Sequence, residues 1–168
     1  MAARIDTDLQ GGIGMMRNSQ STLLRQLRKG GAIDCDGLDK QDMVVATQEL
    51  GLSLLVADCD RARSRSAVLR AIAKAVDFPE FFGGDMDALY DCLCDTVFDN
   101  KSGVVLWLYR LHSGDPALAD DATLIDGVCA DVVQFASENG RVFSYVIEHA
   151  GEHPEAEPGV AAAPYGES

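Results

Sequence analysis

The chain has 168 residues, 47% hydrophobic and 24% charged, so it is long enough for one domain with a proper core. Acidic residues outnumber basic ones by 27 to 14, and the net charge of −13 disfavours nucleic acid and anionic membranes as partners and favours basic proteins. Residues 1–20 contain no continuous apolar segment and no window approaches a membrane-spanning run, which predicts a cytoplasmic protein without a signal peptide.

The first third of the chain is predicted to be an addition to the main domain. Residues 1–20 are rich in Gly, Asp, Ser and Asn without periodicity, which predicts disorder. Residues 21–51 form a predicted N-terminal extension, in which a short helix begins at Ser21. A candidate strand follows at 32–35, and a second helix ends at Gly51.

The main domain is predicted at residues 52–150, before a tail at 151–168 whose Ala, Glu, Gly and Pro content predicts disorder. Apolar runs typical of buried strands lie at 52–57, 104–109 and 142–147, and helices are expected at about 66–76, from Met86 onward and at about 121–138. The alternation predicts an α/β fold with a small, mostly parallel three-stranded sheet packed by helices. The extension offers residues 32–35 as a candidate edge strand.

The last of these helices is expected to bury one continuous stripe. Its apolar residues recur at helical spacing. They are Leu124, Ile125, Val128, Cys129, Val132 and Phe135. The single tryptophan, Trp107, lies in the run at 104–109 and is interpreted as a packing residue.

The cysteines and histidines give little support for a metal site. Five scattered cysteines suit reduced thiols better than a disulfide framework. Cys92 and Cys94 are i, i+2 neighbours on a predicted helix and point in different directions. His149 and His153 are four residues apart, but Gly151 between them disfavours a helical site. We therefore expect no metal and no cofactor.

One stretch in the middle of the chain is built to present carboxylates. Pro79 should end the incoming helix near Asp77, and Asp85 is a good N-cap for a helix that begins at Met86. The apolar residues of this helix share one face, and they are Met86, Leu89, Leu93 and Val97. A second face consists of Asp87, Asp91 and Asp95, which repel one another at i, i+4 spacing.

This acidic stripe has two interpretations. The ordinary one is a solvated polar face on an acidic protein, and arginines in the loop at 61–65 are candidates to pair with Asp91 or Asp95 within the chain. The other is a surface for a cationic partner. Phe81, Phe82 and Tyr90 flank the acids, and aromatic residues surrounded by charge are typical of interface centres.

The same stretch carries a family resemblance. Residues 78–93 read FPEFFGGDMDALYDCL. This run resembles, without a gap, the hallmark of the barstar-type ribonuclease inhibitors, Leu-Pro-x-aromatic-aromatic-Gly-x-Asn-x-Asp-Ala-Leu-Trp-Asp-x-Leu. The resemblance begins at residue 52 and implies the barstar-like fold, a three-stranded parallel sheet packed by helices. It also implies that Asp91 occupies the place of an RNA phosphate and that Asp87 pairs with ribonuclease cations.

The resemblance implies a set of partner-binding residues in the loop and on the helix. They are Phe81, Phe82, Gly83, Gly84, Asp85, Asp87, Tyr90, Asp91 and Cys94. The chain departs from the pattern where Phe81 lacks a tyrosine hydroxyl, Asp85 replaces Asn and Tyr90 replaces Trp. The family's glutamate on the later helix falls on Phe135, so that contact is not carried over.

Three functions follow as hypotheses. The first is a protein inhibitor that blocks the active site of a basic ribonuclease with the acidic helix and its loop. The alternative is an immunity or regulatory binding protein of the same fold for a different toxin or partner. An enzyme is disfavoured, because Asp87 and Asp91 have no accompanying nucleophile, phosphate loop or hydrolase motif in the sequence. No oligomeric state is predicted.

Overall fold

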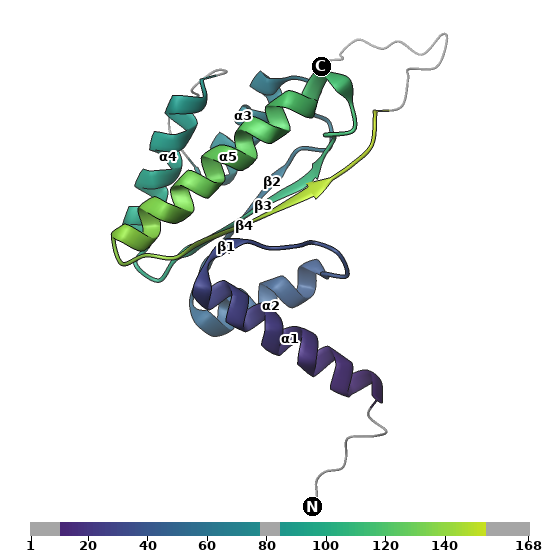
Figure 1. Cartoon of the computed structure of the whole chain (residues 1–168), viewed down its shortest axis with the longest axis vertical. Helices are drawn as coiled ribbons and strands as arrows, with labels where there is room; N and C mark the ends of the chain where they lie inside the picture. Colours follow the sequence, from purple (N-terminus) through teal and green to yellow (C-terminus); the bar gives the residue numbers. More distant parts are fainter. Residues whose placement is uncertain (1–10, 78–84, 154–168) are drawn as a thin grey trace, which may run out of the picture.

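A computed structural model describes residues 11–77 and 85–153, and of residues 11–19 it describes the backbone alone. The helices are α1 (Gly11–Lys29), α2 (Lys40–Leu50), α3 (Arg65–Ala75), α4 (Met86–Asp99) and α5 (Pro116–Glu138). The strands are β1 (Gly31–Ala32), β2 (Ser53–Asp58), β3 (Val104–Leu111) and β4 (Phe143–His149). Figure 1 shows their arrangement around one sheet.

The sheet has four parallel strands in the order β1-β4-β3-β2. The three strands expected in the main domain are its centre and one edge, with Ser53 opposite Val104 and Val104 opposite Phe143. The candidate strand at 32–35 is present as β1, but it is shorter and begins one residue earlier, at Gly31. The predicted α/β fold with a small parallel sheet is therefore confirmed, with the extension adding the fourth strand.

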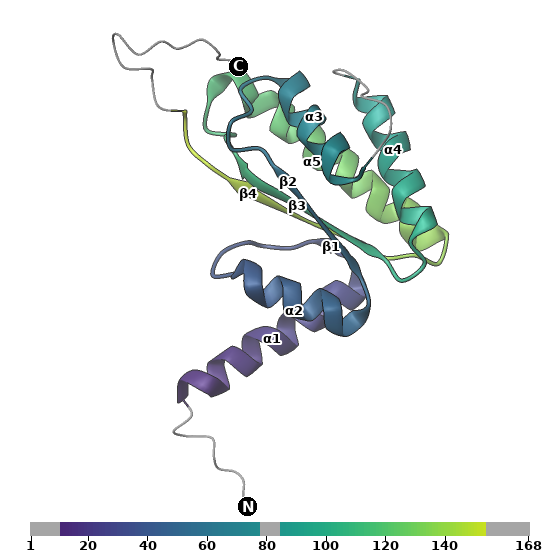
Figure 2. The same cartoon turned by 180° about the vertical axis from the view of Figure 1, so that it is seen from behind.

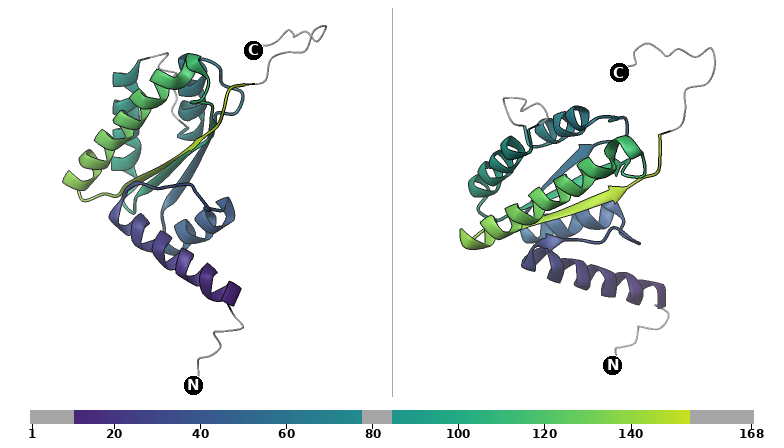
Figure 3. Two further views of the ribbon diagram at one scale, coloured as in Figure 1. Left: turned by 45° about the vertical axis from the view of Figure 1, so that its right-hand side comes forward. Right: turned by 45° about the horizontal axis from the view of Figure 1, so that its top comes forward.

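Helices cover both faces of the sheet. Figures 1 and 2 show α3, α4 and α5 on one face and α1 and α2 on the other, and Figure 3 shows the same layers from two further sides. Each interface has its own core, because successive side chains of a strand point to opposite faces. On β3, Leu106 and Leu108 face the three-helix layer while Val105 and Trp107 face α1 and α2.

The N-terminal extension and the main domain share the second of these cores. Leu27 of α1 and Met43 of α2 are fully buried there together with Val146 of β4. Trp107 is 3% exposed in the same cluster, as its packing interpretation predicted, and its indole N–H donates to Glu148 Oε1 at 3.1 Å. The extension is therefore a packed layer of the fold.

Two helices begin earlier than the sequence predicted. Helix α1 begins at Gly11 instead of Ser21, so residues 11–20, predicted to be disordered, are helical. Helix α5 begins at Pro116, because the Asp115 side chain accepts from the N–H of Ala117 and Pro is well suited to a first helical turn. The predicted disorder of residues 1–10 and 154–168 concerns segments outside the described residues.

One residue of the predicted α5 stripe faces solvent. Leu124 is 46% exposed, whereas its neighbour Ile125 is fully buried. The buried positions of α5 recur every three or four residues and are Leu118, Ala122, Ile125, Cys129, Val132 and Ala136. Leu124 lies about 100° around the helix from Ile125, which takes it off this stripe.

The cysteines do not form disulfide bonds. All five are free thiols, and Cys35 alone is not buried. Burial raises the pKa of Cys59 to about 12 and that of Cys92 to about 11, so both remain protonated and unreactive at neutral pH.

Within residues 11–77 and 85–153, no helix combines the length and the apolar character needed to cross a membrane.

Candidate protein-binding site

Helix α4 begins where the sequence predicted. Asp85 has an extended backbone, and its carboxylate accepts from the backbone N–H groups of Asp87 at 2.9 Å and Ala88 at 3.4 Å. These bonds satisfy two of the donors that a helix N-terminus leaves unpaired. The negative charge of Asp87 in the first turn is further favoured by the helix dipole. These interactions fix the N-terminal end of α4, where Asp87 begins the acidic face.

The inner face of α4 anchors it to the three-helix layer of the core. Leu89, Leu93 and Val97 are at most 1% exposed, and Met86 packs against the same cluster from a half-buried position. This face confirms the predicted apolar spacing. Each fully buried side chain of this size contributes about 1.5–3 kcal/mol, so the orientation of α4, and with it the outward direction of its other face, is firmly set.

The outer face of α4 presents the three acids. Asp87, Asp91 and Asp95 are exposed, and none of them forms a salt bridge with another residue of the described chain. Arg65, from the arginine-rich loop that was a candidate to pair with them, binds Asp121 of α5 at 2.7 Å instead. The three carboxylates of the stripe therefore lie on one helix face, and no cation among the described residues forms a salt bridge with them.

Tyr90 lies between the acids and the core. Its ring is half-buried and packs against the three-helix cluster. A hydrogen bond with Cys94, one turn later, is the first cause that raises the pKa of Tyr90 to about 12, followed by burial and by the charges of Asp131 and Glu138 on α5. Tyr90 therefore remains a neutral phenol at physiological pH.

Two groups of predicted contact residues remain, Cys94 and residues 81–84. Cys94 is 7% exposed and belongs to the core cluster, so its side chain offers a partner little surface, and burial raises the pKa of its thiol. Phe81, Phe82, Gly83 and Gly84 lie outside the described residues. The acids at 85, 87 and 91 and the phenol of Tyr90 are the predicted site residues that lie together at the surface of α4.

A pocket that the sequence did not predict lies beside the C-terminal half of α4. Its volume is about 600 Å3. It is lined by Val76, Asp77, Asp95, Thr96, Phe98, Asp99, Asn100 and Phe135. Phe98 is 51% exposed, and Arg141 stacks on its ring at 4.7 Å while donating to its carbonyl oxygen at 3.1 Å. One feature of the sequence indicates this surface: the aromatic residue directly after Val97 does not share the helical spacing of the buried face.

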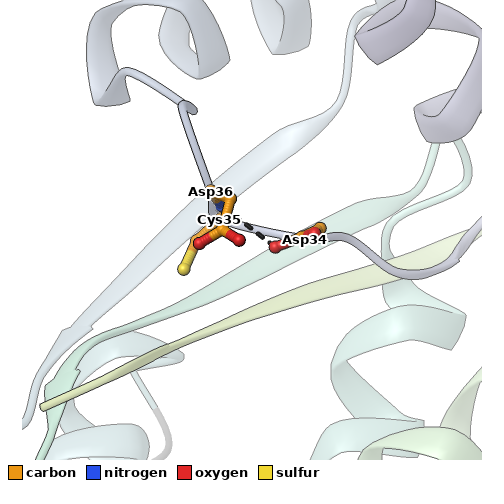
Figure 4. A group of neighbouring side chains, drawn as sticks. All are labelled: Asp34, Cys35 and Asp36. Atoms are coloured by element: carbon orange, nitrogen blue, oxygen red, sulfur yellow. Dashed lines mark hydrogen bonds between the residues drawn. The ribbon is translucent and has the colours of Figure 1, made fainter.

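Figure 4 shows a group of potential metal ligands that follows β1 in the chain. Asp34, Cys35 and Asp36 hold their ligand atoms within 4.8 Å of one another, beside a pocket of about 490 Å3. The N–H of Asp36 donates to Asp34 Oδ1 at 3.0 Å, so a local turn accounts for the closeness of these consecutive residues. Burial and the adjacent acids raise the pKa of Cys35, which disfavours the thiolate that a metal requires. No metal function is assigned to this group.

The fold and this surface define a class: a parallel α/β domain that displays an acidic helix. Residues 52–148 match the family model described as barstar (barnase inhibitor). The match covers more than half of the chain, from the strand before β3 to the last residues of β4, and the chain therefore belongs to the barstar family. Comparison with curated proteins found no match.

Proposed function

We propose that the chain is a protein inhibitor of a basic ribonuclease and that α4, with the loop before it, occupies the enzyme's active site. One observation carries the proposal: Asp87 and Asp91 are exposed on a rigid helix face and have no salt-bridge partner among the described residues. Membership of a family described by inhibition of barnase supplies the class of target. No chemical step is required of the inhibitor.

The proposed mechanism is mimicry of the substrate's charge. A ribonuclease must bind RNA phosphates with cationic groups, and a carboxylate held at the same point receives charge-assisted hydrogen bonds from those groups. Asp91 is proposed for this role, as the resemblance implies, and Asp87 is proposed for a neighbouring cation. Both side chains are on a helix whose buried face fixes its orientation, so little ordering is left to oppose binding.

The charge of the whole molecule supports fast association. A net charge of −13 gives the chain a negative field that attracts a basic protein before contact and weakens with salt. The pocket beside α4 extends the acidic surface, because Asp95 and Asp99 line it together with the exposed ring of Phe98. We propose that this pocket is the rim of the interface, where a basic side chain of the target packs against Phe98.

A second candidate is an immunity or regulatory protein for a toxin other than a ribonuclease. The observation that favours it is Tyr90, where the family pattern has tryptophan. The Tyr90 side chain is half-buried, and its single ring presents a smaller aromatic surface than the indole of tryptophan. A contact of different shape suits a different partner. Isolation of a partner without ribonuclease activity, bound through Asp91, would favour this candidate.

The test is a calorimetric titration of the full chain with a panel of basic ribonucleases, in parallel with RNA-cleavage assays at low and moderate salt. The proposal expects one-to-one binding to at least one member of the panel, with loss of cleavage at the same stoichiometry and weaker binding at higher salt. Binding without inhibition would contradict active-site occlusion. A folded protein that binds no member of the panel would transfer support to the second candidate.

A further inference from the structure

The pocket beside the C-terminal half of α4 has an apolar side that three helices build. Val76 caps α3, Phe98 lies on α4 and Phe135 lies on α5. Val76 and Phe135 are half-buried, whereas Phe98 is 51% exposed. The volume of about 600 Å3 lies within the range of about 300–1,000 Å3 that is typical of ligand pockets, so the pocket has room for a side chain of a partner.

The polar side of the pocket is acidic. Its carboxylates are those of Asp77, Asp95 and Asp99. All three are exposed, and none forms a salt bridge with another described residue. The hydroxyl of Thr96 donates to the carbonyl oxygen of Cys92 at 2.8 Å, and the amide of Asn100 donates to the carbonyl oxygen of Thr96 at 2.7 Å. The pocket therefore offers mainly negative acceptors, next to an apolar wall.

The chain itself shows which cation stacks on this ring. The guanidinium carbon of Arg141 lies 4.7 Å from the centre of the Phe98 ring. Nε and Nη2 of Arg141 each donate to the carbonyl oxygen of Phe98 at 3.1 Å, and Nη1 donates to the carbonyl oxygen of Asn139 at 3.2 Å. Arg141 does not line the pocket, whereas Phe98 does. One part of the ring thus carries a guanidinium, and another part faces the pocket.

We propose that the pocket is an arginine-selective subsite, which holds a guanidinium of a basic partner between the ring of Phe98 and the carboxylates of Asp95 and Asp99. A guanidinium is planar and weakly hydrated, stacks on aromatic rings and donates to carboxylates through a fork of N–H groups. The ammonium group of lysine is a strongly hydrated point charge and lacks this shape. The methylene groups of the arginine stem pack along Val76 and Phe135.

The resident Arg141 leaves the pocket attractive to a second cation. Its single positive charge is outnumbered by the three carboxylates of the pocket, and Asp95 lies one turn after Asp91, so the subsite continues the acidic face of α4. The inference rests on the proposed function for the class of partner, a basic protein. It adds the side chain that such a protein must carry at the edge of the contact, an arginine.

The test is an NMR titration of the full chain with acetyl-Gly-Arg-Gly-amide and with its lysine analogue, at about 0.15 M salt to screen long-range attraction. The backbone amide signals of residues 95–99 are followed. We expect saturable shifts, with a dissociation constant about two- to fivefold lower for the arginine peptide, which is the size of an exposed cation–π interaction. Equal constants for the two peptides, or shifts that saturate with neither, would overturn the subsite.

Three variants assign the preference to the pocket. Phe98→Leu keeps an apolar side chain at an exposed position without an aromatic face, so it should lose the preference for arginine. Asp99→Asn should weaken both peptides about two- to fivefold, as expected for one exposed ion pair. Glu49→Gln on α2 is the control and should change neither constant. An arginine preference that survives in Phe98→Leu would overturn the role of the ring.

Asp91→Ala separates the subsite from the proposed function. Asp91 does not line the pocket, so this variant should bind the arginine peptide within about twofold of wild type at this salt concentration, although it is expected to lose affinity for a ribonuclease. A wild type that prefers the arginine peptide and inhibits no ribonuclease would retain the subsite and reject the target class. A wild type that inhibits a ribonuclease without preferring the arginine peptide would reject the subsite alone.

Discussion

The carboxylate of Asp85 accepts a hydrogen bond from the backbone N–H of Asp87 at 2.9 Å, so the acid that begins α4 fixes the first acid of the exposed stripe. We predict that Asp85→Ala lowers the free energy of unfolding by about 1 kcal/mol, because the N-cap bonds to Asp87 and Ala88 are lost. Asp85→Asn should be close to wild type, since asparagine is an equally good cap. Urea denaturation measures both, and equal loss in the two variants would assign the effect to charge.

A second prediction concerns the bond between β4 and α5. The hydroxyl of Tyr145 donates to Asp126 Oδ1 at 2.7 Å. Tyr145→Phe and Asp126→Ala should each lower the free energy of unfolding by about 1 kcal/mol, as expected for a single hydrogen bond that is partly shielded from water. A double-mutant cycle should show that the two losses do not add. Additive losses would mean that the two side chains contribute independently.

The same tyrosine predicts a pH dependence. Burial, followed by the hydrogen bond to Asp126, raises the pKa of Tyr145 above its usual range. The folded-state pKa is higher than that of the unfolded chain, so the contribution of Tyr145 is fully present below about pH 10 and is lost as the pH rises through the folded value. The stability difference between wild type and Tyr145→Phe should therefore shrink from about pH 9 to about pH 11. A constant difference would contradict the assigned direction.

Two glycines should respond in opposite ways to alanine. Gly103 has a φ of +122° at the start of β3, and a Cβ there would lie 2.9 Å from both Leu52 Cδ2 and the carbonyl oxygen of Val142. Gly103→Ala should cost more than about 1 kcal/mol, from backbone strain and overlap together. Gly127 lies within α5 with no atom near its Cβ position, so Gly127→Ala should gain about 0.5–1 kcal/mol. Thermal unfolding of the two variants provides the measurement.

The sequence predicted most of the sheet and of α4 because these elements depend on local patterns. The apolar run that contains Trp107 and the spacing of Leu89 and Leu93 have clear periods, and Asp85 is a strong cap signal. The early beginning of α1 has no such signal, since residues 11–20 lack an apolar period. Its helical state depends on the continuation into Leu23 and Leu27, which pack against the sheet.

The candidate site was predictable only in part. The acids of α4 follow from helical spacing, whereas the pocket beside Phe98 depends on how α3, α4 and α5 come together. The burial of Cys94 likewise depends on tertiary packing, because Cys94 belongs to the core cluster that α3, α4 and α5 form with the sheet. The burial of His112 against His153 joins two segments that are far apart in the sequence, and no local pattern indicates such a contact.

We propose Asp91 as a principal contact with a basic ribonuclease. Asp91→Ala removes an exposed carboxylate that has no salt bridge in the described chain. The free energy of unfolding of the variant should therefore lie within about 0.5 kcal/mol of the wild-type value. Glu49→Ala is the matched control, because Glu49 is an exposed acid on α2, which covers the opposite face of the sheet. It changes the net charge by the same amount.

The deciding measurement is the dissociation constant of wild type, Asp91→Ala and Glu49→Ala with a ribonuclease that the wild type inhibits. We expect Asp91→Ala to lose at least about 2 kcal/mol of binding free energy, or about thirtyfold in affinity, and Glu49→Ala to lose less than about threefold. Added salt should weaken wild-type binding more than it weakens the Asp91→Ala complex. Equal dissociation constants for the two variants would show that only the overall charge matters, which would contradict the role of Asp91.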